Sequence, residues 1–428
     1  MGGEPRFRTD FQFLWLGQSL AAIGTQIPTL AIPLTAITVL HASVGAVGML
    51  NALQWLPFMV LSVCVGVAVD RHRRRPLLIV ADGGRAAVIG AIVLLAVTGH
   101  LSLPLLWGLV FLFGSGTVLF ELTLPAYVPG IVGTERLMRA NTRLQATTTG
   151  AQLGGPAFAG VLIQALTAPV ALGLNGVSLL VSVATLSAIR TREAVVPAAS
   201  ATPHPWDELF QGFRVTWRNP YLRSLVPVSA CYNLFNEWML TVYLVYAVRH
   251  LHLSPALLGL TLAGGTVGAF LGALMADMAV RRFGLGATFL GAVVLECLAA
   301  PLVPITPSGK VLTLPLLVVA LGLMDFGAVV SGVVALSVRQ TVTPPRLMGR
   351  MTASYRMISY GAIPVGAAMG GWAGQVLGLR TGLFIGSIAL MTTIVWAIRC
   401  PVVRLRSIGD LPPTEASSYA KRGIKCRL

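Results

Sequence analysis

Long apolar runs separated by short polar connections dominate the chain. A helix needs about 20 predominantly apolar residues to cross a bilayer. By that criterion the pattern predicts an all-α integral membrane protein with twelve transmembrane helices. The predicted spans are 11–38, 44–69, 77–98, 102–125, 141–165, 168–189, 220–248, 254–279, 284–305, 311–337, 347–375 and 378–399.

One polar connection, residues 190–219, is much longer than the others and divides the spans six and six. Its second part contains Phe210, Phe213 and Trp217 at helical spacing, which predicts an amphipathic helix lying on the membrane surface. The predicted organisation is an N-terminal six-helix half (1–190), a cytosolic linker with an amphipathic helix (191–219), a C-terminal six-helix half (220–403) and a basic cytosolic tail (404–428).

The charge distribution orients the chain in the membrane. Only 11% of the residues are charged, against about 25% in soluble domains, and the net charge is +16. With the N-terminus inside, only Arg249, Lys310 and Arg380 of the 31 Lys and Arg fall on outer loops. By the positive-inside rule this predicts a multi-pass protein of a bacterial-type inner (plasma) membrane with both termini cytosolic. The basic charge thus indicates a lipid bilayer as its partner, with no nucleic acid.

The sequence offers little for metal or enzyme chemistry. The five Cys have no paired spacing, and the six His all lie in loops or at span ends. No HExxH motif or intramembrane Ser-Lys pair is present. We expect no disulfide, no metal site, no cofactor and no enzymatic activity, and we expect a monomer.

An internal repeat relates the two six-helix halves. The tripeptide RLM occurs at 136–138 and again at 346–348, 210 residues later. The stretch GVAVDRHRRR at 66–75 has a weaker copy at 273–282, in the equivalent inner loop. Two halves in the same orientation predict a parallel repeat about an axis along the membrane normal.

The stretch at 66–75 carries more than an orientation signal requires. Gly66 has no Cβ and permits close approach of a neighbouring helix. Asp70 stands at the end of a span, where a carboxylate can accept hydrogen bonds from Arg side chains or from a helix N-terminus. The simpler alternative is a positive-inside anchor and nothing more.

These features resemble the major facilitator superfamily. The stretch at 66–75 resembles its signature loop, G-x-x-x-D-R-x-x-R-R, and GAQLGGPAFAG at 150–160 resembles its antiporter motif. The segments at 82–85, 139–141 and 349–366 resemble the bacterial efflux branch that includes enterobactin exporters.

The resemblance implies roles for two groups of residues. One would form a cytosolic gate that ties the two halves together: Gly66, Asp70, Arg71, Arg74, Arg75, Asp277, Arg281 and Arg282. The other would form the antiporter-like helix: Gly150, Gly154, Gly155, Pro156 and Gly160. For the second group, close packing of small residues is the alternative interpretation.

Four carboxylates lie well inside predicted spans. A charge at the bilayer centre costs about 3 kcal/mol on insertion scales, and protonation removes that cost, so such acids are candidates for proton coupling. In the family that the chain resembles, spans one, four, seven and ten line the central cavity, whereas span nine is peripheral, so Glu296 could instead be an interhelical hydrogen-bonding group. The candidate substrate and proton-coupling residues are Asp325, Glu237, Glu121, Glu296, Asn233, Asn236 and Gln26.

Taken together, these features predict a secondary active exporter of small amphipathic molecules, such as drugs, siderophores or natural products. Proton antiport would drive export by alternating access. A solute uptake symporter and a lipid transporter of the same fold are the alternatives. Because no Arg was expected near a bilayer midpoint, the predicted aliphatic cavity favours cationic or neutral amphipaths over phosphorylated ones.

Overall fold

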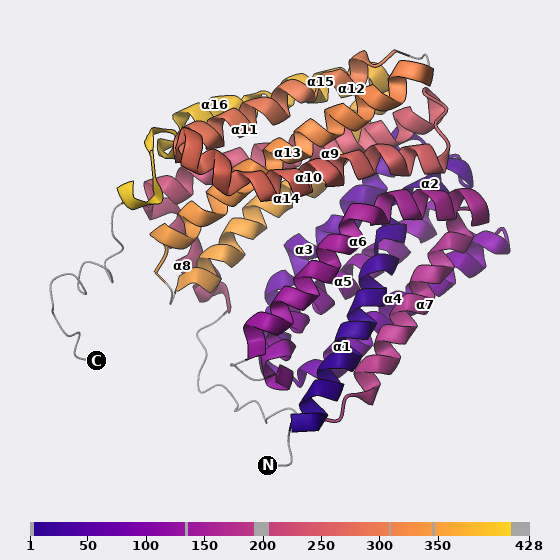
Figure 1. Ribbon diagram of the computed structural model, residues 1–428. Coiled ribbons are helices and arrows are strands. Elements are labelled where there is room, and N and C mark those ends of the chain that lie inside the picture. The colour runs from indigo at the N-terminus through magenta and orange to yellow at the C-terminus, as the bar shows by residue number, and fades with distance from the viewer. Residues whose placement is uncertain (1–3, 133–135, 192–204, 308–309, 345–346, 412–428) are drawn as a thin grey trace. The chain divides into compact units, whose positions relative to one another are not determined.

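The computed structural model describes residues 4–132, 136–191, 205–307, 310–344 and 347–411 (Figure 1). The chain divides into two compact units, of which unit 1 takes segments from both sequence halves and unit 2 takes the end of the linker, most of the C-terminal half and the tail. Unit 1 contains Met1–Thr202, Thr241–Ala263 and Ala367–Leu379, and unit 2 contains Pro203–Leu240, Gly264–Gly366 and Arg380–Leu428.

The described part of the chain is helical and contains no strand. Its first eight helices are α1 (Glu4–Gly24), α2 (Gln26–Thr38), α3 (Val44–Arg71), α4 (Arg74–Val97), α5 (Leu103–Val132), α6 (Leu137–Leu166), α7 (Ala168–Ala188) and α8 (Pro205–Arg218). They are followed by α9 (Pro220–Arg249), α10 (Pro255–Phe283), α11 (Leu285–Ala299), α12 (Leu302–Ile305), α13 (Lys310–Val342), α14 (Met348–Val376), α15 (Leu379–Leu390) and α16 (Thr392–Arg399). Two 3₁₀ turns, Pro401–Arg404 and Ile408–Asp410, end the described chain.

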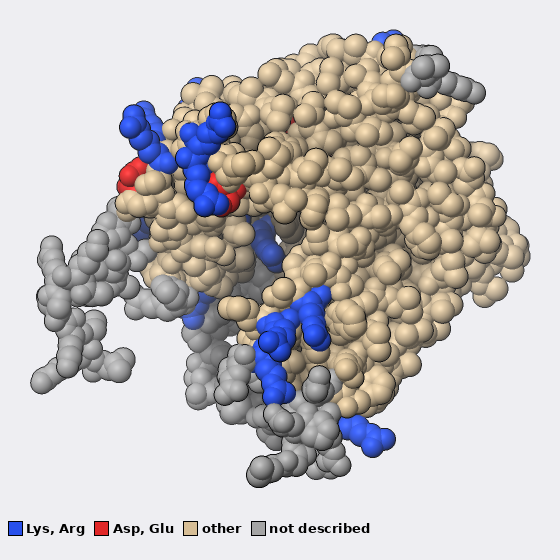
Figure 2. Space-filling model, in the orientation of Figure 1, with Lys and Arg blue, Asp and Glu red and all other residues tan. Residues whose placement is uncertain are grey.

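Nine helical segments of the described chain are long and apolar enough to cross a membrane. Helices α6, α9 and α14 have 30, 30 and 29 residues, so they are long enough to span but are not among these nine. The all-α membrane architecture is confirmed, whereas the count of twelve spans stays a prediction. Most of the face in Figure 2 carries no charged residue, and Lys and Arg gather in clusters near its edge, as expected for a surface that contacts lipid.

Unit 1 is built around close helix packing. Helix α4 packs against both α5 and α7, and α1 packs against α6 and α7. Leu14, Leu78, Phe120 and Leu186 belong to one buried cluster that joins these helices. The predicted first span is two helices, α1 and α2, that meet at Thr25, and this interruption brings polar side chains of both helices to one place.

In unit 2, α11 packs against α13, and the chain after α16 returns to the start of α11. The N–H groups of Leu285 and Gly286 donate to the carbonyls of Arg406 (2.9 Å) and Leu405 (2.8 Å). These bonds satisfy donors that the first turn of a helix leaves without an intrahelical partner.

Helix α8 covers most of the predicted amphipathic segment. Gly212 lies against the backbone of Arg350 at the start of α14, and Thr216 is fully buried. Phe210 and Trp217 are 65% and 54% exposed. A helix with one packed face and exposed aromatic residues suits the membrane interface, and that location stays a prediction.

Candidate functional site

A cavity of about 510 Å³ lies within unit 1, where α1 to α6 converge. Its lining is mostly polar and aromatic. Helix α6, which is not among the nine apolar spans, contributes Thr147, Thr148 and Gln152. Two of the sequence candidates, Gln26 and Glu121, line it as well. This unit 1 cavity therefore brings together candidates from span one and span four.

The Arg of the unit 1 cavity is neutralised by a buried acid. Arg85 and Asp82, 4% and 0% exposed, form an ion pair one turn apart on α4. Ser182 donates to Asp82 (2.6 Å) and accepts from Gln18 (3.0 Å), so the pair is connected to α7 and α1. The guanidinium of Arg85 also stacks 4.6 Å from the centroid of Phe120. Asp82 and Arg85 are three residues apart, so helical periodicity places them on one face of α4, and a buried pair with these extra contacts is expected to stiffen this unit.

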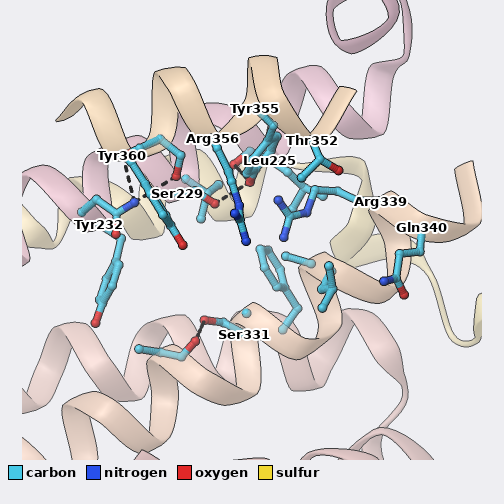
Figure 3. Close-up of a pocket in the computed structure, with 18 of the residues that line it drawn as sticks. Leu225, Ser229, Tyr232, Ser331, Arg339, Gln340, Thr352, Tyr355, Arg356 and Tyr360 are labelled. Atoms are coloured by element: carbon cyan, nitrogen blue, oxygen red, sulfur yellow. Dashed lines mark hydrogen bonds between the residues drawn. The ribbon is translucent and has the colours of Figure 1, made fainter. Parts of the chain in front are cut away.

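A second cavity, of about 570 Å³, lies within unit 2. It is formed by the N-terminal part of α9, by α11, by the C-terminal part of α13 and by the N-terminal part of α14. Three tyrosines, Tyr232, Tyr355 and Tyr360, and two arginines, Arg339 and Arg356, line it (Figure 3). The unit 2 cavity thus combines apolar surface with two Arg and several hydroxyl groups, whereas the sequence predicted a mainly aliphatic cavity. The absence of an Arg near the bilayer midpoint stays a prediction.

The two arginines of the unit 2 cavity rest on aromatic rings. The Arg339 guanidinium lies 4.1 Å from the centroid of the Tyr355 ring, and that of Arg356 lies 5.8 Å from the Tyr360 ring. Tyr355 is held in place because its hydroxyl donates to the Leu225 carbonyl (3.1 Å). Among the described residues, neither guanidinium has an ion pair or a hydrogen bond.

Glu296 is the acid that lines the unit 2 cavity. The residue is 2% exposed, its side chain is hydrogen-bonded with Ser331 of α13, and its Oε2 has no partner among the described residues. Asp325 lies near enough for its charge to act on that of Glu296, and it faces Gly265 of α10. Glu296 thus has the predicted interhelical hydrogen bond and also borders a cavity.

The remaining candidates of α9 have different surroundings. Asn233 lines the unit 2 cavity and donates to the carbonyl and hydroxyl oxygens of Ser359, both at 2.9 Å. Glu237, one turn later, is 9% exposed and has no hydrogen bond among the described residues. Asn236 is half-buried. Of the three residues, only Asn233 is among those that line this cavity.

Two contacts in unit 1 repeat with an offset of 211 residues. Gln164, near the end of α6, accepts from the N–H of Ala256 at the start of α10 (3.2 Å). Gln375, near the end of α14, accepts from the N–H of Gly45 at the start of α3 (3.1 Å). Gln375 lies 211 positions after Gln164, and Ala256 lies 211 positions after Gly45. We call these two equivalent bonds the glutamine clasp. It joins the two sequence halves at one end of unit 1.

Facing glycines accompany each bond of the clasp. A Cβ at Gly160 would lie 3.0 Å from the Cα of Gly259, and a Cβ at Gly48 would lie 2.7 Å from the Cα of Gly371. These close crossings exist because neither partner has a side chain. Within the antiporter-like motif, Gly160 therefore serves close packing, and Gly155 faces the side chain of Gln26.

Described contacts of the predicted gate lie within one sequence half. Arg75 donates to the carbonyls of Leu186 (2.8 Å) and Ser187 (2.5 Å) at the end of α7, which stabilises that helix terminus. Asp277 and Arg281 form an exposed ion pair on α10. The side chain of Asp70 lies outside the described part of the structure, and a gate between the halves stays a prediction.

Comparison with known proteins identifies the family. The model of the transmembrane secretion effector family matches residues 4–418, nearly the whole chain. The chain belongs to this family of major facilitator transporters. The resemblance noted in the sequence is therefore confirmed, and the protein is a multi-pass membrane transporter by family.

Relatives of this transmembrane secretion effector include efflux proteins. Multidrug efflux pump Tap of Mycolicibacterium fortuitum is 25% identical over 365 residues, which cover 83% of this chain and 87% of the pump. Enterobactin exporter EntS of Citrobacter koseri is 24% identical over 375 residues, covering 87% and 86% of the two chains.

Solved transporters share the fold. The nucleoside transporter NupG matches with a TM-score of 0.72 and 11% identity, covering 91% of this chain and 98% of its own. A bacterial homologue of the iron transporter ferroportin, in its inward-facing state, matches with a TM-score of 0.71 and 16% identity, over the same shares. At these identities the likeness establishes architecture alone.

Sequence reasoning missed the two most distinctive features of this transporter. Arg339 was not singled out, because an Arg two residues beyond the end of a predicted span (311–337) looks like an orientation signal. The glutamine clasp was also missed, although a signal was present. Leu-His-x-Ser occurs at 40–43 and 251–254, and both His residues, His41 and His252, adopt positive φ (49° and 52°) just before the clasped helices.

Proposed function

We propose that this protein is a proton-driven exporter of small amphipathic molecules in the plasma membrane, with both termini in the cytosol. The observation that carries the proposal is the similarity, along more than four-fifths of the chain, to a multidrug efflux pump and to an enterobactin exporter. The antiporter-like residues 150–160 also favour export over uptake.

Alternating access is the proposed mechanism. The glutamine clasp and its facing glycines hold the sequence halves together at one end of unit 1 through two neutral hydrogen bonds and close backbone contacts. A neutral hydrogen bond contributes only about 1 kcal/mol net, so such a closure can open and reform during a transport cycle. The repeat symmetry means that the two bonds would open together.

Protons would be coupled through the intramembrane acids of unit 2. Glu296, Asp325 and Glu237 are the candidates. Glu296 and Glu237 are buried and Asp325 is half-buried, so protonation of each would relieve an unfavourable charge within the membrane. Proton binding would then favour one conformation of the transporter, and proton release the other.

Transport direction and coupling can be tested together. In an efflux-deficient host, expression should lower accumulation of exported compounds from a toxic-compound panel, and an uncoupler should abolish the difference. An uptake symporter would instead raise accumulation.

Purified protein in proteoliposomes should carry protons inward as substrate leaves, and Glu237→Gln/Asp325→Asn should uncouple the two fluxes. Full efflux by this double variant would reject the acid assignment. Movement of a fluorescent lipid between leaflets, without efflux of any compound, would favour the lipid transporter.

A further inference from the structure

The unit 2 cavity presents two cations that lack an anion. Arg339 and Arg356 both line it, and among the described residues neither is ion-paired. Figure 3 shows both side chains reaching into the space between the helices, with Ser331 across from them. Arg356 is exposed and Arg339 is half-buried. Two guanidinium groups that border one cavity repel each other, and an anion bound between them would relieve that repulsion.

The acid of the cavity does not serve as that anion. Glu296 is hydrogen-bonded with Ser331, and no nitrogen of Arg339 or Arg356 lies within 4.0 Å of it by the ion-pair criterion. The arrangement differs from the unit 1 cavity, where Arg85 is paired with Asp82.

The positive-inside rule, which places Lys and Arg at the cytosolic ends of spans, does not explain Arg356. It stands eight residues after Met348, the first residue of α14, which at 1.5 Å per residue places it about 12 Å along the helix. An Arg that only anchors the helix would extend toward the headgroups or pair with an acid. The Arg356 side chain instead lies over Tyr360, inside the lining of the cavity.

The aromatic rings favour a particular class of anion. Stacking on Tyr355 leaves the N–H edge of the Arg339 guanidinium available, and such an edge matches carboxylate or sulfonate oxygens in a bidentate fashion. Tyr360, 39% exposed, and Tyr232 supply further aromatic surface. A volume of about 570 Å³ accommodates a drug-sized molecule.

From this geometry we infer that the unit 2 cavity binds amphipathic organic anions, with the acidic group between Arg339 and Arg356 and the apolar body against the tyrosines. The inference rests on the proposed exporter function in one respect, because it names the substrate class of that exporter. It replaces the expectation of cationic or neutral substrates.

Binding to the purified full chain in phosphatidylcholine nanodiscs tests the inference directly. The probes are 2-naphthalenesulfonate and its uncharged analogue 2-naphthalenesulfonamide, measured by equilibrium dialysis. The sulfonate should bind at least about tenfold more tightly, as expected for a charge-assisted hydrogen bond. Equal binding of the two probes would overturn the inference.

Variants locate the binding. Arg339→Gln and Arg356→Gln should each weaken sulfonate binding about tenfold or more and leave sulfonamide binding unchanged, and Arg356→Lys should recover part of the loss. Arg223→Gln is the matched control, because Arg223 is exposed on α9 and does not line the cavity. Thermal unfolding of each variant in nanodiscs separates lost binding from lost folding. Unchanged sulfonate binding in folded Arg339→Gln and Arg356→Gln would reject the site.

Lipid headgroups also carry anionic oxygens, so a second set of nanodiscs contains phosphatidylglycerol. Unchanged sulfonate binding there supports a soluble anion, whereas competition by phosphatidylglycerol would assign the site to lipid and reject the substrate class. If the sulfonate binds but no compound is exported by cells, the exporter proposal fails and the site stands. If only cations or neutral compounds are exported and the sulfonate does not bind, the anion site fails and the exporter proposal stands.

Discussion

The two cavities use arginine in opposite ways. In unit 1, Arg85 is buried, paired with Asp82 and stacked on Phe120, so its charge is satisfied by the protein itself. In unit 2, Arg339 and Arg356 are stacked on tyrosines and are unpaired among the described residues. Both cavities have similar volumes, so the difference lies in charge rather than in size.

A guanidinium group can thus stabilise the fold in one half of the repeat, whereas we infer a ligand-binding role for it in the other. A buried ion pair is costly to break and changes little during a cycle, which suits a structural role. An unpaired, partly exposed guanidinium gains its partner only when an anion arrives. The experiments below are arranged by the size of the effect that this contrast predicts.

The largest effect is expected for Asp82→Ala. This change leaves Arg85 buried without its counter-charge, which should lower the free energy of unfolding by about 3 to 5 kcal/mol. Thermal and denaturant unfolding of purified protein measures the loss. The double variant Asp82→Ala/Arg85→Leu should regain most of it, because it removes both charges. A stable single variant would show that the pair is not structural and would end the contrast between the cavities.

The second effect concerns the acids of the two cavities. Glu296→Gln should slow substrate-driven proton uptake into proteoliposomes about tenfold, equivalent to about 1.4 kcal/mol. The reason is that Glu296 is buried with an unpartnered oxygen, whereas Glu121 is exposed in the unit 1 cavity. Glu121→Gln should therefore have the smaller effect, about twofold at most. A larger loss in Glu121→Gln would move proton coupling to unit 1.

These contrasts also show what a sequence can predict. Apolar run lengths predicted the membrane architecture because span length follows from bilayer thickness. The more polar helices α6, α9 and α14 were also predicted as helices at nearly their observed bounds. They are the helices that carry many of the polar side chains of the two cavities.

The cavity charges were harder to predict. Asp82 and Arg85 are three residues apart, so their pairing follows from helical periodicity alone. The meeting of Arg339 with Tyr355 requires two different helices in a particular register, which hydropathy does not contain. The four acids were found because an intramembrane carboxylate is conspicuous, whereas an Arg near a span end is ordinary.

A smaller effect is expected for Tyr355→Phe. The variant keeps the ring under Arg339 but loses the hydroxyl that bonds to Leu225 (3.1 Å) and contacts Ser229 (2.5 Å). Stability should fall by about 1 kcal/mol, the usual net value of a hydrogen bond, while sulfonate binding persists. Tyr355→Leu, which also removes the ring, should weaken binding. If Tyr355→Phe abolishes binding while the protein stays folded, the hydroxyl and not the ring recognises the ligand.

The smallest effect is the most informative for the comparison. Arg356→Gln should change the free energy of unfolding by no more than about 0.5 kcal/mol, as for a residue outside any structural network. Arg85→Gln, the matched change in unit 1, should be strongly destabilising because it leaves Asp82 buried and unpaired. Both are measured by unfolding without ligand. Should Arg356→Gln prove as damaging as Arg85→Gln, Arg356 would be structural too, and an anion between the two arginines would no longer be needed to explain their placement.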